Sequence, residues 1–341
     1  MWESSTAGGP ATLSAGTPDT VLEVENLSVE FRLRGRVVHA VDEISYALGR
    51  RETLAILGES GSGKTVSVRA VMGLLASPPA VITGSVRFDG SDLLALSRNE
   101  RRGVCGTRIS MVFQEALAAL NPVFTIGFQL GEVYRVHRGY SRRRARQASA
   151  ELLERVGIPA ARDRLRDYPH QFSGGMRQRV LIAMAVALEP DVLIADEPTT
   201  ALDVTVQAQI IELLDSLKAQ TDMGLILITH DLGVVAESSD RVAVMYAGRI
   251  VETGPVGEVF AHPAHPYTEG LLRSMPQSGG KGQLIPIPGA PPSLSSLPPG
   301  CPFHPRCPYA EPVCKTARPP LASVGDGRAS ACHFSDRLLA V

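Results

Sequence analysis

The feature that most constrains the fold is the octamer at residues 58–65, Gly-Glu-Ser-Gly-Ser-Gly-Lys-Thr, which fits the pattern GxxxxGK followed by Ser or Thr. It follows a short apolar run at 54–57 and precedes a predicted helix at 64–75, which we expect the prolines at 78 and 79 to stop. Glycines permit positive φ angles, so the backbone N–H groups of such a loop can surround an anion at the start of the helix. This order of strand, loop and helix predicts an α/β fold that binds phosphate.

The side chains of this loop match the chemistry of a nucleoside triphosphate bound with Mg²⁺. Lys64 can reach the β- and γ-phosphates, and the Thr65 hydroxyl can ligate Mg²⁺. The residues predicted to hold the nucleotide are Gly58, Ser60, Gly61, Ser62, Gly63, Lys64, Thr65 and Val66. The octamer does not by itself separate ATPases, kinases and GTPases.

A pair of carboxylates follows a second apolar run. Residues 192–195 are Val-Leu-Ile-Ala, as in a strand buried on both faces, and Asp196 and Glu197 come next. Ligands of α/β proteins bind at the carboxyl ends of the strands. We therefore expect Asp196 to hold Mg²⁺ and Glu197 to polarise the attacking water as general base.

Composition limits the partners of the chain. Its 341 residues carry a formal net charge of −1, so there is no overall basic surface for nucleic acid, and we predict no nucleic-acid partner. No stretch reaches the roughly 20 apolar residues that span a bilayer. Residues 1–20 lack the basic start and apolar block of a signal peptide and are predicted to be a disordered tail. We expect a cytosolic protein whose contact with a membrane is peripheral.

The pattern of apolar residues divides the rest of the chain. Short strand-like runs occupy 21–57, and helical periodicity dominates 115–190, including a helix at 141–156 that Ser141 caps. Prolines are dense after residue 276, which indicates a loop-rich segment. The predicted parts are the tail 1–20, a nucleotide-binding domain at 21–265 whose helical subdomain covers about 115–185, and an extension at 266–341.

Residues 172–179, Phe-Ser-Gly-Gly-Met-Arg-Gln-Arg, resemble the signature sequence of ABC transporter ATPases. The more common form has Leu first and Gln fifth, so Phe172 and Met176 depart from it while Ser-Gly-Gly is kept. The Ser173 hydroxyl and the N–H groups of Gly174 and Gly175 can form a second phosphate cradle at a helix start. The resemblance implies that this cradle contacts the γ-phosphate of an ATP held by a partner subunit.

Three further positions fit the same family. Gln114 matches the Q-loop glutamine, which the family uses to sense Mg²⁺ and the attacking water. Asp203 closes a D-loop at 200–203, and His230 matches the switch histidine that contacts the γ-phosphate. The resemblance implies an ABC-type P-loop ATPase with a RecA-like α/β core, an antiparallel β subdomain and a helical subdomain. It also implies a head-to-tail dimer that binds and hydrolyses two ATPs.

Longer blocks resemble one branch of the family, the importers of dipeptides, oligopeptides and nickel. They lie at 112–122 around Gln114, at 245–254 and at 265–276. The resemblance implies an ATP-hydrolysing subunit at the cytoplasmic face of the cell membrane that powers uptake of peptides or a related small solute. It implies as partners a second ABC ATPase subunit, two transmembrane permease subunits and an extracytoplasmic solute-binding protein.

Two alternatives remain open: the ATPase of an ABC exporter, and a soluble ABC-type ATPase that is not coupled to transport. Soluble ABC ATPases of DNA repair insert long heptad coiled coils between the phosphate loop and the signature. Here Lys64 and Ser173 are only 109 positions apart, without sustained heptads, which disfavours that class. The direction of transport rests on the resemblance alone.

Four of the five cysteines lie in the last 41 residues, in the pattern C-x5-C-x6-C-x17-C. In a reducing cytosol, clustered cysteines indicate a metal site before disulfides, and four thiolates suit an iron–sulfur cluster or tetrahedral Zn²⁺. The four are Cys301, Cys307, Cys314 and Cys332. The segment resembles the C-terminal region of oligopeptide-importer ATPases, some of which carry a 4Fe–4S cluster. A cluster is therefore the first expectation, Zn²⁺ the second and free buried thiols the third.

Overall fold

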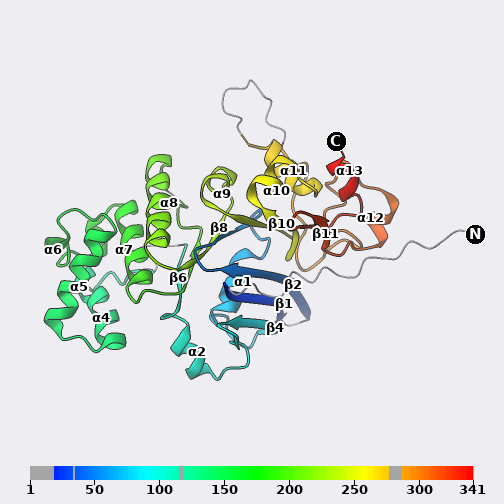
Figure 1. Ribbon diagram of the computed structural model, residues 1–341. Helices are drawn as coiled ribbons and strands as arrows, with labels where there is room; N and C mark the ends of the chain where they lie inside the picture. Colours follow the sequence, from blue (N-terminus) through cyan, green and yellow to red (C-terminus); the bar gives the residue numbers. More distant parts are fainter. Residues whose placement is uncertain (1–18, 34, 115–118, 201, 276–285, 341) are drawn as a thin grey trace, which may run out of the picture. The chain divides into compact units, whose positions relative to one another are not determined.

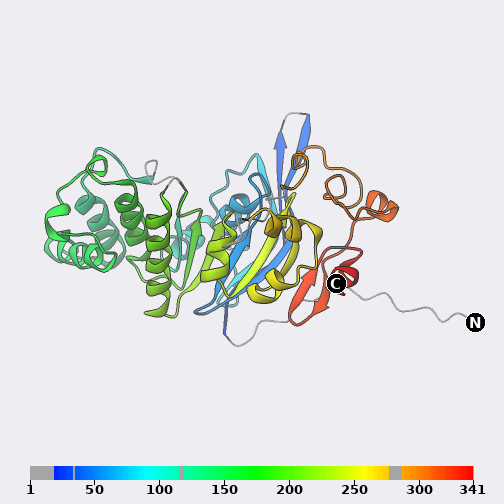
Figure 2. The ribbon, with the colours of Figure 1, turned by 90° about the horizontal axis from the view of Figure 1, so that it is seen from above.

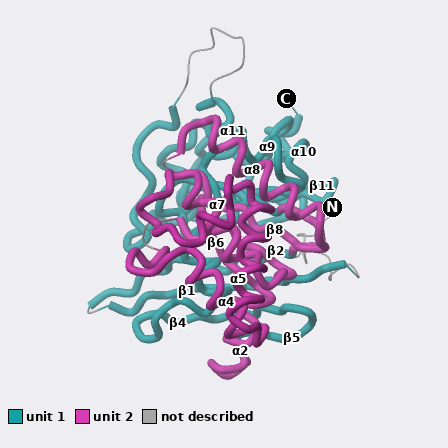
Figure 3. The backbone as a smooth tube through the Cα atoms, turned by 90° about the vertical axis from the view of Figure 1, so that its left-hand side faces the viewer, with its two compact units in different colours: residues 1–47, 54–94, 229–341 teal, residues 48–53, 95–228 magenta. Residues whose placement is uncertain are grey.

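The computed structural model describes residues 19–33, 35–114, 119–200, 202–275 and 286–340. The predicted tail at 1–20 lies outside the described residues except for its last two positions, and so do parts of the importer-like blocks at 112–122 and 265–276. Two compact units divide the chain (Figure 3). Unit 1 comprises residues 1–47, 54–94 and 229–341, and unit 2 comprises residues 48–53 and 95–228.

Unit 1 contains an antiparallel sheet with the strand order β2-β1-β4-β5 (Figure 1). Its strands are β1 (Thr20–Leu33), β2 (Arg36–Gly49), β4 (Ala80–Phe88) and β5 (Ser91–Asp92). Side chains on alternate positions of a strand point to the same face, and Leu22 and Val24 are buried in this way. An irregularity at Asn26 shifts the register, after which Leu27 and Val29 take over the buried face. This sheet is the antiparallel β subdomain that the sequence predicted.

Unit 1 also contains five hydrogen-bonded strands in the order β11-β12-β10-β9-β3, which belong to an eight-stranded sheet. Its strands are β3 (Thr53–Leu57), β9 (Arg241–Tyr246), β10 (Arg249–Pro255), β11 (Ala322–Gly325) and β12 (Arg328–Ser330). Strand β3 runs parallel to β9, and β12 pairs antiparallel with β10, where Ser330 lies opposite Glu252. The C-terminal extension therefore adds two strands to the sheet from which the octamer at 58–65 emerges.

The helices of unit 1 include one that departs from the sequence-based prediction. They are α1 (Lys64–Val71), α9 (Leu232–Ser238), α10 (Val256–Ala261), α11 (Pro266–Arg273), α12 (Pro312–Thr316) and α13 (Ser335–Leu339). Helix α1 was predicted to reach Leu75 but ends at Val71. Gly73 takes the left-handed region (φ 68°), which ends the helix before the prolines are reached. Figures 1 and 2 show residues 286–340 of the extension, coloured orange to red, beside α10 and α11 in yellow.

Unit 2 combines parallel strands with a group of helices. Its strands, in the order β8-β7-β6, are β6 (Ile109–Val112), β7 (Val192–Asp196) and β8 (Gly224–Thr229). Its helices are α2 (Arg98–Val104), α4 (Ile126–Arg138), α5 (Arg142–Arg155), α6 (Ala161–Arg164), a 3-10 turn at Pro169–Gln171, α7 (Gly174–Val186) and α8 (Val204–Ala219). Ser141 caps α5, as predicted, by accepting a hydrogen bond from the Arg144 N–H. Nowhere in the described ranges does a helix have both the length and the apolar character needed to cross a membrane.

Aromatic rings attach the extension to the rest of unit 1. Tyr246 ends β9, Tyr267 lies in α11 and Phe303 belongs to the extension, and each is 2% exposed or less. The ring centroids lie 4.6 Å apart for the two tyrosines, and 5.2 and 5.5 Å from Phe303. Burying an aromatic side chain stabilises the folded state by about 1.5–3 kcal/mol. The extension is therefore fixed by packing as well as by strand pairing.

A buried histidine makes the stability of unit 1 depend on pH. His265 is 2% exposed, and its Nδ1 accepts a hydrogen bond from the Tyr267 N–H at 3.0 Å, so this ring nitrogen carries no proton. Burial lowers the pKa of His265 from 6.5 to about 3. Below pH 6.5, His265 therefore binds a proton in the unfolded chain but not in the folded chain. The free energy of unfolding consequently decreases as the pH falls.

We expect the free energy of unfolding to fall by up to about 1.4 kcal/mol for each pH unit below 6.5, because one extra proton binds to the unfolded state. The measurement is denaturant unfolding of the full chain at pH 7 and pH 5. His265→Asn keeps an acceptor for the Tyr267 N–H and should lose this part of the pH dependence. Identical pH dependence in the variant and the wild type would contradict the assignment to His265.

Candidate functional site

The predicted phosphate loop connects β3 to α1. Gly63 precedes α1 with φ 103°, and a Cβ at this position would lie 2.5 Å from the Ala40 carbonyl oxygen, so glycine is required. Lys64 is 5% exposed and donates from Nζ to the carbonyl oxygens of Gly58 (2.7 Å) and Glu59 (3.0 Å). The ammonium group therefore lies against the backbone of its own loop at the start of a helix. A cation and helix-terminal N–H groups together suit a phosphate.

A cavity of about 410 Å³ adjoins this loop within unit 1. It is lined by Arg36, Val38, the loop residues 59–62, Tyr246, Ala247 and residues 291–295 of the extension. The sequence left the adenine-stacking aromatic unassigned, because Val37 and Val38 occupy the stretch after Phe31 where the family often has it. Tyr246 is the aromatic residue in this lining.

The acidic pair ends a strand that is buried throughout. Asp196 is the last residue of β7 and is fully buried, and Glu197 follows in the left-handed region (φ 47°). The Glu197 N–H donates to the Ile228 carbonyl oxygen at 2.9 Å, which fixes this turn to the end of β8. The Gln114 Nε2 donates to Glu197 Oε2 at 2.9 Å. Within unit 2 the structure thus brings together the predicted base and the predicted Q-loop glutamine.

Thr200 is a member of this group whose contact the sequence reasoning missed. Its hydroxyl donates to the same Glu197 Oε2 at 2.9 Å, so one carboxylate oxygen accepts from two side chains. Thr200 had been placed in the D-loop only. The spacing of three residues from Glu197 was a usable signal, because a turn brings positions i and i+3 together.

The predicted switch histidine lies in a tight turn after β8. His230 is exposed and stands between Thr229, the last residue of β8, and Asp231, which caps α9. The Asp231 carboxylate accepts from the N–H groups of Gly233 (2.8 Å) and Val234 (3.3 Å). Capping fixes the backbone on the C-terminal side of His230, while its imidazole stays accessible.

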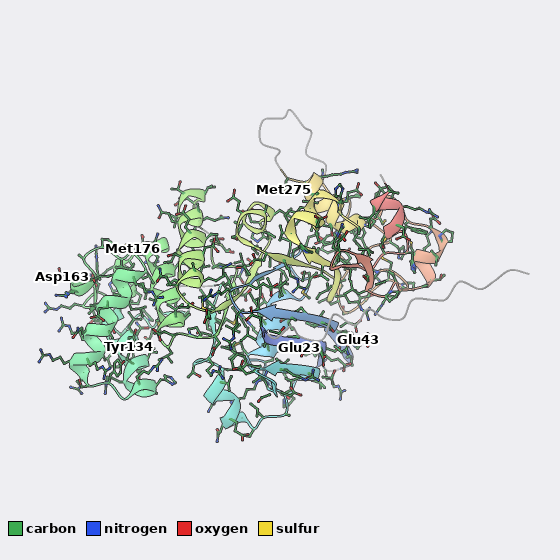
Figure 4. All side chains as sticks on the ribbon, viewed as in Figure 1. Glu23, Glu43, Tyr134, Asp163, Met176 and Met275 are labelled. Atoms are coloured by element: carbon green, nitrogen blue, oxygen red, sulfur yellow. The ribbon has the colours of Figure 1, made fainter. Side chains whose placement is uncertain are left out.

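The signature residues begin helix α7. Ser173 is the N-cap and accepts from the Met176 N–H at 3.3 Å, and Met176, labelled in Figure 4, lies in the first turn. Ser173 and Gly174 are exposed. A Cβ on Gly175 would lie 2.5 Å from a Val206 methyl group, so a side chain there would displace the start of α8. Ser173 and Gly174 are therefore accessible at a helix start, where an anion is favoured.

The D-loop aspartate has a structural partner. Asp203 is the N-cap of α8, and its carboxylate accepts from the Val206 N–H at 3.0 Å. Because Val206 also packs on Gly175, the cap of α8 and the start of α7 are adjacent within unit 2. Ala201, between Thr200 and Asp203, lies outside the described residues.

The four cysteines of the extension line one cavity of about 770 Å³. They are Cys301, Cys307, Cys314 and Cys332, and all four are free thiols. Burial raises the pKa of Cys307 and of Cys332 to about 11, and the neighbouring cysteines add to both shifts. A metal bound here would have to displace these protons, because the thiolate is the form that binds metals.

The predicted metal site at these cysteines is not shown by the structure. Among the described residues, no three His, Cys, Asp or Glu side chains form a group that could hold a metal ion. The four thiols nevertheless line the same cavity, and both Zn²⁺ and 4Fe–4S clusters accept thiolate ligands.

Comparison with known proteins identifies the family. Residues 41–200 match the model described as ABC transporter, and residues 251–314 match the model described as oligopeptide/dipeptide transporter, C-terminal region. The chain is 51% identical to the dipeptide transport ATP-binding protein DppD of Bacillus subtilis over 321 residues, covering 94% of this chain and 96% of the relative. It is 49% identical to DppD of Escherichia coli over 315 residues, with 92% and 96% covered.

Solved structures show the same fold. The ATP-binding cassette MJ0796, a dimer bound to ADP and phosphate, superposes with a TM-score of 0.62 at 25% identity, covering 69% of this chain and 98% of that one. Fold, phosphate loop, signature and both family matches agree, and the chain belongs to the ATP-hydrolysing subunits of ABC transporters, in the branch that carries the oligopeptide/dipeptide transporter C-terminal region.

Proposed function

We propose that this chain hydrolyses ATP to power the import of dipeptides, oligopeptides or a related small solute. The observation that carries the proposal is the match of residues 251–314 to the oligopeptide/dipeptide transporter C-terminal region. Similarity to two dipeptide transport proteins over more than nine-tenths of the chain supports the same branch. An exporter or an uncoupled ATPase has no comparable support.

Within this function we assign roles in Mg-ATP binding and hydrolysis to the predicted residues. The loop residues 58–66 bind the phosphates, and Lys64 neutralises the charge that develops on them. Thr65, Gln114 and Asp196 hold Mg²⁺ or its waters, and Glu197 activates the water. His230 contacts the γ-phosphate. The hydrogen bonds that Gln114 and Thr200 donate to Glu197 support this role, because they orient the carboxylate.

The chain acts as half of a head-to-tail ATPase dimer. Ser173, Gly174 and Gly175 contact the ATP held by the partner subunit, with Asp203 in the loop that crosses the interface. The exposure of Ser173 and Gly174 at the start of α7 supports this assignment, since the start of a helix favours an anion. The dimer works with two transmembrane permease subunits and an extracytoplasmic solute-binding protein, at the cytoplasmic face of the membrane.

Uptake measured in the source organism tests the direction and the solute. Cells lacking this gene should take up a radiolabelled dipeptide more slowly than the parent, and the wild-type gene should restore uptake while Lys64→Ala should not. Faster accumulation in the deletion strain would instead identify an exporter. Unchanged flux of dipeptides, longer peptides and nickel would contradict the import function.

We also propose that Cys301, Cys307, Cys314 and Cys332 bind a 4Fe–4S cluster, with Zn²⁺ as the alternative metal. The shared cavity and the soft thiol donors support this assignment. When bound, the cluster would cross-link a segment that has little regular structure of its own. The role is structural, because the site lies in the extension and none of the assigned ATP residues lines the cavity.

We expect protein purified without oxygen to contain about four irons and four sulfides per chain. Cys332→Ser should lose the metal and unfold at a lower temperature. Cys105→Ser is the matched control, because Cys105 lies in unit 2 and should keep both metal and stability. Finding one zinc per chain would support the Zn²⁺ site in place of the cluster. Protein without iron, sulfide or zinc would contradict a metal site.

A further inference from the structure

The second residue of the phosphate loop, Glu59, is bonded at all three of its polar groups within unit 1. Its N–H donates to the Tyr267 hydroxyl at 2.9 Å, and its carbonyl oxygen accepts from the Lys64 Nζ at 3.0 Å. Its carboxylate accepts two hydrogen bonds from Arg306, with Nη1–Oε2 at 2.7 Å and Nη2–Oε1 at 3.0 Å. Glu59 thus connects the lysine of the loop to the C-terminal extension.

The arginine in this contact is held as firmly as the glutamate. The Arg306 side chain is 5% exposed, and its Nε donates to the Pro288 carbonyl oxygen at 2.9 Å. Its Nη1 also reaches the Tyr246 hydroxyl at 3.4 Å. A planar guanidinium that makes two parallel bonds to a carboxylate fixes both distance and orientation, which a lysine cannot do. Because the Arg306 side chain is buried and Glu59 is 28% exposed, the pair is screened less by salt than a pair on the surface.

The contact with Arg306 adds to the backbone hydrogen bonds of the loop, such as that from the Ser62 N–H to the Glu59 carbonyl oxygen at 3.3 Å. Gly61 and Gly63 both adopt positive φ angles, which glycine reaches without strain but also leaves readily. The carbonyl oxygens of Gly58 and Glu59 determine where the Lys64 ammonium lies. A shift of Glu59 would therefore move the cation that faces the phosphates. Small displacements of a charged group weaken its interaction with a ligand markedly.

We propose that Arg306 is a positioning residue for ATP binding: it holds Glu59, and through Glu59 the phosphate loop and Lys64, so that the cysteine-bearing segment becomes part of the nucleotide site. Arg306 immediately precedes Cys307, which lines the cysteine cavity. The extension therefore contributes to the affinity for ATP, beyond its structural attachment to the sheet. The inference rests on the role proposed above for the phosphate loop and does not depend on the transported solute.

The test compares the dissociation constant for Mg-ATP of the full chain and four variants, by titration calorimetry. Arg306→Gln and Glu59→Gln should each raise the dissociation constant about tenfold, or about 1.4 kcal/mol. The double variant should bind Mg-ATP with the same dissociation constant as either single variant, because both substitutions remove the same contact. Arg306→Lys keeps the charge but loses the paired bonds and should lie between Arg306→Gln and the wild type. In the assembled transporter the KM for ATP should rise in the same order with a smaller change in kcat.

Arg337→Gln is the matched control. Arg337 also belongs to the extension, but it pairs at 2.6 Å with Glu311 and both side chains are largely exposed, so ATP affinity should stay at the wild-type value. If Arg306 has only a structural role, Arg306→Gln should melt at a lower temperature, while both folded single variants bind Mg-ATP with the wild-type dissociation constant. That result would overturn this inference and leave the phosphate-loop assignment intact. Should Arg306→Gln not fold, Glu59→Gln decides in the same way. A wild-type chain that binds no ATP would refute the phosphate-loop assignment itself.

Discussion

Replacing Glu197 with glutamine should lower the kcat of ATP hydrolysis at least about 100-fold and leave ATP binding close to the wild-type value. A positioned general base contributes roughly 10²–10⁴-fold to the rate. Glutamine has the same shape and keeps an oxygen that can accept from Gln114 and Thr200, so the turn after β7 should survive. The variant therefore separates proton abstraction from structure.

Phosphate release by the assembled transporter is the measurement for this variant. Glu212→Gln is the control, because Glu212 is an exposed carboxylate on α8 of the same unit. A transporter with this substitution should hydrolyse ATP at the wild-type rate. Thr200→Val should reduce kcat by a smaller factor, since it removes one of two hydrogen bonds to the carboxylate. Normal steady-state hydrolysis by Glu197→Gln would disprove the assignment of the base.

Replacing Lys64 with alanine should raise the dissociation constant for Mg-ATP about 100-fold or more and abolish hydrolysis. The change removes the buried cation of the loop and leaves the carbonyl oxygens of Gly58 and Glu59 without its two hydrogen bonds. A charge-assisted hydrogen bond contributes about 1.5–3 kcal/mol, and 100-fold corresponds to about 2.7 kcal/mol. The expected loss is therefore of the size that one lost phosphate contact would produce.

Binding of a fluorescent ATP analogue to the full chain measures the Lys64→Ala effect. Lys315→Ala serves as the control, because Lys315 is an exposed lysine of the extension and its loss should not alter affinity. Circular dichroism should give the same secondary structure for both variants. An affinity within threefold of the wild type would mean that the phosphates bind elsewhere.

Local signals made much of the fold predictable. The buried strand predicted at 192–195 is β7, and Ser141 was predicted as a helix cap, because apolar patterning and capping chemistry act over a few neighbouring residues. The error at the end of α1 has a local cause too. Gly73 could already have been read as a terminator, since glycine in the left-handed region commonly follows the last turn of a helix.

Contacts between residues that are far apart along the chain could not be predicted from the sequence. Arg306 and Glu59 are 247 positions apart, and nothing in either neighbourhood indicates the other. His265 and Tyr267 belong to a block that resembles peptide importers. Their burial depends on how α11 packs, which the sequence does not indicate. Strand pairing of β12 with β10 was likewise hidden, because prolines made the extension resemble a loop. Tertiary packing decided each of these features.

The central claim is that this subunit converts ATP hydrolysis into inward transport of peptides. Its most direct test is uptake of a radiolabelled dipeptide by proteoliposomes that hold this subunit, its partner ATPase and both permeases, with the solute-binding protein on the side from which the solute enters. We expect uptake that requires Mg-ATP on the side of the ATPase subunits and that disappears when this subunit carries Glu197→Gln. Uptake that proceeds equally without ATP, or ATP-driven movement of the peptide in the opposite direction, would contradict the account.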